Sequence, residues 1–262
     1  MFTKPKKSLG QNFLIDKNII NKIISISNIL NKDVLEIGPG TGNLTEYILR
    51  EKPKKLFLVE KDKILCDQLK TKFQDKVEII NNDILKINEK NISKNKLVVF
   101  GNLPYNISTE IICNWILKLE EVFWFSELIL MFQKEVADRI VSEIDTSDYG
   151  RLSIILNWKM DIKKVFDVGP NCFFPKPKVN SSLIHFTPKK NFSKIKKSKN
   201  LEKITRIFFN QRRKMIKNPL KQLFTNYEEI SNKLKLDIKL RPQNLTLETY
   251  CNLVREYEKL NS

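Results

Sequence analysis

Apolar and polar positions alternate along this chain in two patterns. Short apolar runs predict buried strands, and apolar residues spaced three and four apart predict helices between them, as over residues 17–30 and from Ser108 onward. Strands and helices that alternate in this way are typical of an α/β fold with a parallel sheet. Four short apolar runs predict consecutive strands, at residues 33–37, 55–59, 77–80 and 97–100.

Glycines or acidic residues follow the first three predicted strands. Gly38 and Gly40 follow the first, Glu60 ends the second at 20 residues beyond Gly40, and Asp83 follows the third. Ligands of open α/β sheets bind along the edge where the strands end, where an acid after the second strand can accept ribose hydroxyls. An acid after the third can accept an adenine amine. Because the spacing Gly-x-Gly-x-Gly differs from the dinucleotide fingerprint and Glu36 stands just before it, we expect a ligand without phosphate.

The segment Asn102–Tyr105 closes the fourth strand and completes this edge. Pro104 fixes its own backbone and keeps Leu103 extended, so the Asn102 side-chain oxygen and the Leu103 carbonyl are held together as two acceptors. Tyr105 adds a ring that can lie on a flat heterocycle. Each of these residues alone is also ordinary turn or capping chemistry. The ordered set along four strand ends favours a site for a base with an exocyclic amine.

Positive charge is concentrated in one part of the chain. The net charge is +17, and residues 176–217 hold 14 Lys or Arg against one acid, Glu202, which is +13 of that total. An AT-rich genome would also favour Lys, and charged runs are usually solvated faces, but the concentration favours nucleic acid over an anionic membrane. The residues that we expect to contact RNA phosphates are Lys176, Lys178, Arg206, Arg212, Arg213 and Lys214.

The pattern changes near Pro188, after a strand predicted over residues 179–186. A lysine-rich linker at 189–199 is followed by apolar residues at helical spacing from Leu201 to Ile216. We therefore predict a first domain of residues 1–188 and a small basic helical RNA-binding domain of residues 189–262.

Cysteine and histidine give no sign of a metal site. The four cysteines are widely separated, without a Cys-x-x-Cys pair, and the sole histidine, His185, has no acid–base partner in sequence, which also disfavours hydride chemistry. We expect His185 to be structural. No apolar signal-peptide core follows the basic N-terminus and no apolar run reaches ~18 residues, so we expect a cytoplasmic protein without membrane contact.

The motifs of this chain, taken together, resemble those of the KsgA family, which dimethylates adenines in the 3′-terminal hairpin of bacterial small-subunit ribosomal RNA. They cover nearly the whole chain in order: Gly10–Leu14 (GQNFL), Glu36–Gly40 (EIGPG), Gly101–Ser108 (GNLPYNIS), Gln133–Ala137 (QKEVA), Tyr149–Ser153 (YGRLS), Phe173–Val179 (FFPKPKV) and Phe209–Lys214 (FNQRRK).

The resemblance implies a Rossmann-like class I methyltransferase sheet with a small C-terminal helical domain, and S-adenosyl-L-methionine as methyl donor. It implies that Asn102, Leu103, Pro104 and Tyr105 hold the target adenine, with Phe173 on its other face. The residues implied or expected to bind the cofactor are Asn12, Leu14, Gly38, Gly40, Glu60, Asp83 and Asn102.

The implied activity is dimethylation of the N6 amine of two adjacent adenines in 16S rRNA of immature small ribosomal subunits, by a monomer. Two alternatives remain open from the sequence. One is the macrolide-resistance type of 23S rRNA dimethyltransferase, which usually carries Ile where Leu103 stands. The other is an assembly factor that acts mainly by binding small subunits.

Overall fold

The computed structural model describes residues 5–6, 9–119 and 122–261, and the chain divides into two compact units. Unit 1 comprises the described residues of Met1–Ile111, Glu120–Ala137 and Ile162–Pro188, and unit 2 those of Ile112–Leu119, Asp138–Asp161 and Lys189–Ser262. The functional boundary at residues 188 and 189 stays a prediction. The first four residues, on which the expectation about a signal peptide partly rests, lie outside the described part.

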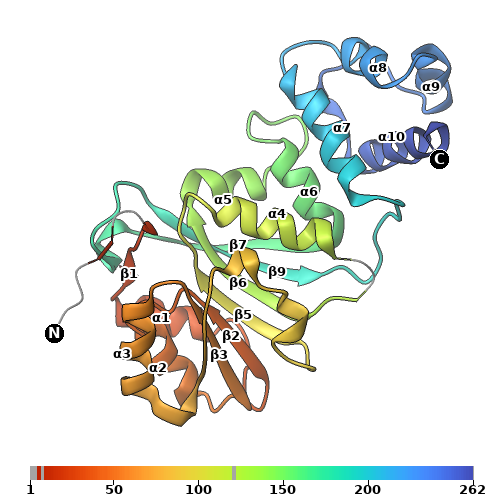
Figure 1. The fold of residues 1–262 in the computed structure, drawn as a ribbon. Coiled ribbons are helices and arrows are strands. Elements are labelled where there is room, and N and C mark those ends of the chain that lie inside the picture. Colours follow the sequence, from red (N-terminus) through yellow and green to blue (C-terminus); the bar gives the residue numbers. More distant parts are fainter. Residues whose placement is uncertain (1–4, 7–8, 120–121, 262) are drawn as a thin grey trace. The chain divides into compact units, whose positions relative to one another are not determined.

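Unit 1 is built on a seven-stranded sheet with the order β4-β3-β2-β5-β6-β9-β7 (Figure 1). The neighbours from β4 to β6 pair in parallel, and β9 pairs with β6 antiparallel. The parallel part of the sheet confirms the predicted α/β class. The strands are β2 (Asp33–Ile37), β3 (Lys55–Glu60), β4 (Glu78–Asn81), β5 (Leu97–Asn102), β6 (Phe125–Gln133), β7 (Met160–Val168) and β9 (Ser181–Pro188).

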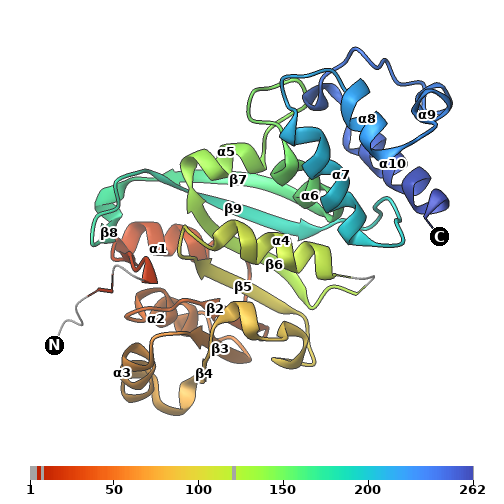
Figure 2. The same cartoon turned by 45° about the horizontal axis from the view of Figure 1, so that its top comes forward.

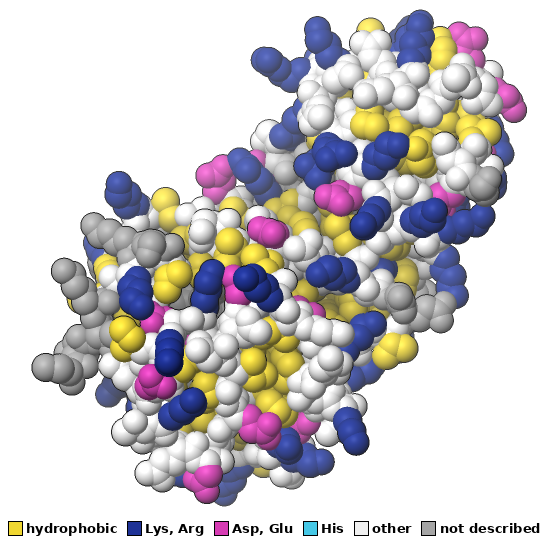
Figure 3. All heavy atoms as spheres, viewed as in Figure 1, with side chains coloured by type: hydrophobic (Ala, Val, Ile, Leu, Met, Phe, Trp, Pro, Cys, Tyr) yellow, Lys and Arg dark blue, Asp and Glu magenta, His cyan; other side chains and the backbone are white. Residues whose placement is uncertain are grey.

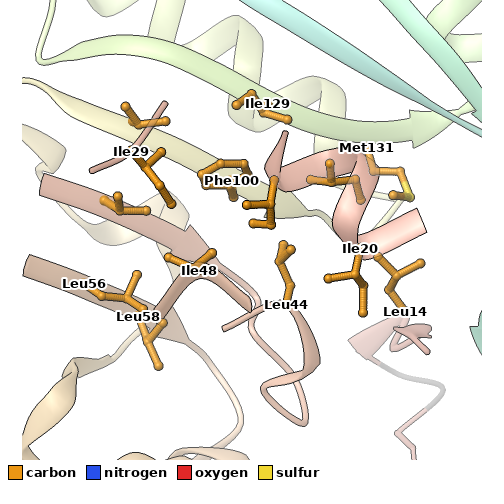
Figure 4. Packing of buried hydrophobic residues seen from close by; sticks show 14 of the residues in the cluster. Leu14, Ile20, Ile29, Leu44, Ile48, Leu56, Leu58, Phe100, Ile129 and Met131 are labelled. Atoms are coloured by element: carbon orange, nitrogen blue, oxygen red, sulfur yellow. The ribbon is translucent and has the colours of Figure 1, made fainter. Parts of the chain in front are cut away.

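Three helices cover one face of this sheet: α1 (Lys17–Ile24), α2 (Asn43–Arg50) and α3 (Lys63–Phe73). Their apolar stripes pack with alternate strand residues into one buried cluster, which includes Ile20, Ile48 and Phe100 (Figure 4). Burying a Leu, Ile or Phe side chain contributes about 1.5–3 kcal/mol, so this cluster is a main source of the unit's stability.

Helix α1 is shorter than its apolar pattern predicts, so the prediction of a helix to residue 30 is wrong at its end. The helix stops at Ile24 because Ser25 caps it, with its hydroxyl donating to the Lys22 carbonyl at 2.9 Å. The Asn28 side chain then accepts the Leu30 N–H at 3.1 Å, which stabilises a turn in place of a further helical turn.

A second, two-stranded sheet in unit 1 was not expected from the sequence. Strand β1 (Phe13–Leu14) pairs antiparallel with β8 (Phe173–Phe174), so Phe13 lies opposite Phe174 and Leu14 opposite Phe173. Figure 2 shows β8 beside α1. The segment before β1 is fixed through Asp62, whose carboxylate accepts from Lys6 Nζ at 2.8 Å and Gln11 Nε2 at 3.2 Å.

Unit 2 is helical and has its own core. Rings of Phe208 and Tyr250 meet edge to face with centroids 5.5 Å apart. The linker predicted at residues 189–199 is packed here: the Trp158 indole donates to the Ser193 carbonyl at 2.7 Å, and Glu258 accepts the Lys196 and Lys197 N–H groups. Its main helices are α6 (Arg151–Lys159), α7 (Ser198–Asn210), α8 (Lys217–Leu223), α9 (Tyr227–Lys233) and α10 (Leu247–Leu260).

Three elements have residues in both units: α4 (Ser108–Lys118), α5 (Lys134–Ile140) and β7. Short 3-10 helices cover Gln74–Lys76, Ile84–Lys86, Glu89–Asn91, Pro170–Cys172 and Pro242–Asn244. No helix in the described part of the chain is long and apolar enough to cross a membrane. Within the same residues, no group of His, Cys, Asp and Glu side chains is placed to hold a metal ion.

Candidate cofactor and substrate site

A cavity in unit 1 lies at the carboxyl ends of strands β2 to β5. The strand order β4-β3-β2-β5 brings the four predicted strand ends together, as expected for a parallel sheet. The predicted site residues that line the cavity are Asn12, Leu14, Gly38, Gly40, Glu60, Asp83, Asn102, Leu103, Pro104 and Tyr105. Phe173 is absent from this lining.

The glycine turn after β2 has a left-handed backbone, and the lack of a side chain at Gly40 lets the Phe13 ring approach it closely. Gly38 and Gly40 have φ of +65° and +59°, a region that L side chains rarely adopt. A Cβ at Gly40 would lie 2.6 Å from Cδ1 of Phe13. The turn therefore leaves room both for a ligand and for the N-terminal segment that covers it.

Glu60 is held rigidly at the end of β3. Its carboxylate accepts the N–H groups of Asp62 at 2.9 Å and of Gly40 at 3.2 Å. Burial raises the pKa of the Glu60 carboxyl above its ordinary value, while these N–H groups oppose the rise. Glu60 thus joins the second strand end to the glycine turn.

Asp83 is ionised at neutral pH. A hydrogen bond from Lys61 Nζ at 2.8 Å lowers the pKa of the Asp83 carboxyl, and the Leu85 N–H adds to the effect at 3.1 Å. An ionised carboxylate only accepts hydrogen bonds, which suits a partner that carries an amine.

Asn102 is oriented by the N-terminal segment. Its Nδ2 donates to the Asn12 carbonyl at 2.8 Å, and Asn12 Nδ2 in turn donates to the Gly10 carbonyl at 3.3 Å. Because the amide nitrogen is engaged, the Asn102 oxygen is the end that remains for a substrate amine. Asn12 and Asn102 both line the cavity, and this contact joins them.

Tyr105 is fixed through its hydroxyl, which lies 2.5 Å from the Ser181 hydroxyl at the start of β9. Burial raises the pKa of the Tyr105 phenol, so it stays neutral near pH 7. The contact holds the ring at the cavity wall. Ser181 is not among the residues predicted from the sequence.

Glu36 also lines the cavity and is not among the predicted site residues. It is 2% exposed, and its carboxyl accepts from the Thr45 hydroxyl at 2.6 Å. Burial raises the pKa of Glu36 to about 8. An acid inside the apolar run of β2 is the signal that could have identified it, since burying an ionisable group is costly.

Phe173 lies in the core. It is 2% exposed and packs with Leu14 in the same cluster as α1. Its role on the face of a target adenine stays a prediction. His185 pairs with Glu127, with Nε2 and Oε2 2.9 Å apart, and lies outside the cavity lining.

The residues expected to contact RNA divide between the units. Lys176 and Lys178 are exposed in unit 1, and Arg206, Arg213 and Lys214 are exposed in unit 2. Figure 3 shows many Lys and Arg side chains over the visible surface. These assignments stay predictions.

Arg212 differs from its neighbours because its guanidinium is engaged within unit 2. It donates to the carbonyls of Ser147 and Tyr149, the latter at 3.0 Å, and to Gln243 Oε1 at 3.4 Å. The Tyr149 hydroxyl donates to the Leu245 carbonyl at 3.1 Å. The motifs at Tyr149–Ser153 and Phe209–Lys214 are therefore joined, which gives the first of them a structural role.

A parallel sheet with this glycine turn, a buried acid after its second strand and an Asn-Leu-Pro-Tyr segment after its fourth defines an S-adenosylmethionine-dependent methyltransferase. Comparison with known proteins identifies the methyltransferase family. The model of the family described as ribosomal RNA adenine dimethylase matches residues 2–259, and the chain belongs to this family.

Named relatives span nearly the whole chain. A Pelagibacter ubique protein named ribosomal RNA small subunit methyltransferase A is 61% identical over 99% of both chains. A Wolbachia (Drosophila simulans) protein of the same name is 42% identical over 98% of this chain and 95% of its own.

Solved structures agree with the fold. A Plasmodium falciparum dimethyladenosine transferase has a TM-score of 0.76 at 26% identity, covering 95% of this chain and 98% of its own. The 23S rRNA methyltransferase ErmE has a TM-score of 0.69 at 23% identity, covering 96% of this chain and all of its own, and supports the fold alone.

Proposed function

We propose that this enzyme dimethylates the N6 amines of two adjacent adenines in the 3′-terminal hairpin loop of 16S rRNA, in assembling small ribosomal subunits. The observation that carries the proposal is the Asn102–Tyr105 segment at the cavity, in a chain 61% identical to a protein named for the small subunit. The identity extends over 99% of both chains, so it includes the basic helical unit as well as the sheet.

S-adenosylmethionine supplies the methyl group on a positively charged sulfur, which is already a strong electrophile. The residues present fit this cofactor: Glu60 faces the cavity as a carboxylate for ribose hydroxyls, and Asp83 as an acceptor for an adenine amine. Gly38 and Gly40 allow close approach of the backbone. We assign Asn12 and Leu14 to the wall that covers the cofactor, because Leu14 in β1 and Asn12 just before that strand both line the cavity.

The acceptor half of the site works by positioning. The Asn102 oxygen and the Leu103 carbonyl accept the two N–H groups of an adenine amine, which draws its lone pair out of conjugation with the ring. No general base is needed, because the proton can leave after the methyl group has transferred. Pro104 keeps both acceptors extended, and Tyr105 stacks on the base that has left its own RNA stack.

The second transfer places a limit on the acceptors. After one methylation the amine keeps a single N–H, so one of the two acceptors must tolerate a methyl group beside it. Both acceptors are held in place, Asn102 by its hydrogen bond to the Asn12 carbonyl at 2.8 Å and the Leu103 carbonyl by Pro104.

The basic residues in both units support an rRNA partner, since Lys and Arg neutralise phosphates without reading sequence. Specificity then comes from RNA shape and from which adenines are unpaired. We place the enzyme in the cytoplasm, where small subunits assemble, and its monomeric state stays a prediction. The alternative of an assembly factor uses the same surfaces.

The test supplies unmethylated small subunits and, separately, large-subunit RNA with labelled S-adenosylmethionine, and then maps the modified bases. We expect dimethyladenine only in the small-subunit hairpin, and none with Asn102→Ala. Label confined to large-subunit RNA would overturn the proposal. Full rescue of subunit assembly by a folded Asn102→Ala protein in cells would favour the assembly-factor reading.

A further inference from the structure

The register of the two-stranded sheet places Phe174 on the same face as a cavity residue. Residues directly opposite in an antiparallel pair point to the same side, with Cβ atoms about 5 Å apart. Phe13 is opposite Phe174, and Leu14 is opposite Phe173. Phe13 lines the cavity and touches the glycine turn at Gly40, so Phe174 lies beside that edge of the cavity.

The two phenylalanines of β8 have opposite environments. Phe173 is 2% exposed in the core, whereas Phe174 is 52% exposed. A phenylalanine ring half open to water contributes less to folding than a buried one. Its ring is therefore available to a partner that offers a flat apolar face.

Charge beside Phe174 indicates which partner that is. Lys176 and Lys178 are exposed two and four residues further along the chain. An exposed aromatic ring next to cations is the combination that binds single-stranded nucleic acid, by stacking a base and contacting phosphates.

We propose that Phe174 stacks on an unpaired nucleotide that flanks the target adenine, while Lys176 and Lys178 contact the adjoining phosphates. The proposal rests on the proposed function, because it takes a single-stranded rRNA loop as the ligand. It adds a second stacking position outside the cavity. With adjacent target adenines, this position holds one adenine while the other is in the cavity.

The test compares ring-keeping and ring-removing variants of the full-length chain in steady-state methylation of unmethylated small subunits. Phe174→Leu keeps an apolar side chain but removes the aromatic face, and Phe174→Tyr and Phe174→Trp keep it. We expect Phe174→Leu to lower kcat/KM by about 5- to 150-fold, the range for losing one base–aromatic stack. The Tyr and Trp variants should remain within about twofold of the parent.

Two controls separate stacking from other causes, and a lysine variant tests the phosphate contact. Leu30→Ala changes an apolar residue of similar exposure, 53%, elsewhere in unit 1 and should leave kcat/KM unchanged. Calorimetry should show unchanged S-adenosylmethionine affinity for Phe174→Leu, because Phe174 is outside the cavity lining. Lys176→Ala should reduce the salt dependence of binding to a protein-free hairpin RNA, by about 0.7–0.9 in the slope.

Each contrary result has a distinct meaning. If Phe174→Leu methylates subunits as fast as the parent, the stacking proposal fails while the proposed function stands. If Phe174→Leu slows methylation of subunits but binds the protein-free hairpin normally, the face contacts a ribosomal protein and the proposal is overturned. If the parent labels no small-subunit adenine, the proposed function itself fails.

Discussion

At the scale of single residues, the Glu36 carboxyl has the largest pKa shift among the titratable groups that line the cavity. Burial raises its pKa from an ordinary value of 4.5 to about 8, with nearby Glu60 adding to the rise and Thr45 and Lys72 opposing it. Between these two pH values the folded chain holds a proton on Glu36 that the unfolded chain has released. Stability therefore falls as pH rises through this window, because the folded state binds more protons.

The substitution Glu36→Gln tests this coupling, since the amide keeps the shape and an acceptor for Thr45. We expect the variant to gain stability relative to the parent as pH rises from about 4.5 to about 8, by a few kcal/mol in all. Urea unfolding at several pH values measures it. A stability difference that stays constant across the window would show that Glu36 titrates normally.

A second prediction concerns Glu60 and the affinity for the cofactor. Because its carboxylate is fixed at the cavity by two backbone N–H groups, Glu60→Ala should weaken S-adenosylmethionine binding by about 1.5–3 kcal/mol, the range for hydrogen bonds to charged groups. Calorimetry measures the affinity. Glu78→Ala removes an exposed acid on β4 and is the matched control. Equal affinities in folded proteins would remove Glu60 from the site.

At the scale of elements, the parallel strands were predictable because each is a short apolar run with a polar end. Glu60 and Asn102 could be placed at one edge because the ends of parallel strands share an edge, whatever the strand order. The end of α1 was not predictable from periodicity, since Ile26 and Ile29 continue the apolar pattern while Ser25 caps the helix. Local hydrogen bonding, and not the apolar periodicity, therefore sets the end of this helix.

The β1–β8 pair could not be predicted from the sequence for another reason. Two-residue strands such as Phe13–Leu14 give no period to detect, and their pairing joins residues about 160 positions apart. The contact of Gly40 with Phe13 depends on that pairing, so the interpretation of the glycine as a ligand-approach position captured only part of its environment. Glu36 stands inside the apolar run of β2, but its hydrogen bond with Thr45 has no fixed sequence spacing that would have predicted it.

Arg212 gives a prediction about how helix α7 is joined to the loop before α6. Its bonds to Ser147, Tyr149 and Gln243 lie within unit 2, so we expect it to act through stability rather than phosphate contact. Arg212→Ala should destabilise the protein by about 1.5–3 kcal/mol in urea unfolding and leave the salt slope of RNA binding unchanged.

The exposed neighbour Arg213 supplies the matched comparison. Arg213→Ala should change stability by less than about 0.5 kcal/mol and lower the salt slope by about 0.7–0.9. If Arg212→Ala instead kept the parent stability and lowered the salt slope of RNA binding, Arg212 would be a phosphate contact.

At the scale of the whole molecule, total charge and charge placement make different predictions. If the net charge of +17 attracts RNA diffusely, any three cations contribute equally to RNA binding. If the basic segment of residues 176–217 binds RNA phosphates directly, only its own cations contribute. Reversal of Arg206, Arg213 and Lys214 to Glu lowers the net charge by the same amount as reversal of three exposed lysines of unit 1. Those control lysines are Lys76, Lys90 and Lys94.

We expect the first triple variant to lower the salt slope of binding to the protein-free hairpin RNA by about 2–3, because each lost phosphate contact removes about 0.7–0.9. The control triple should weaken binding only slightly and keep the parent slope, since exposed charges farther from a phosphate than the Debye length of about 8–10 Å are screened. Affinity measured from about 50 to 200 mM salt gives both slopes. Equal slopes for the two triple variants would mean that the charge acts through its total, and that the basic helices hold no particular RNA phosphates.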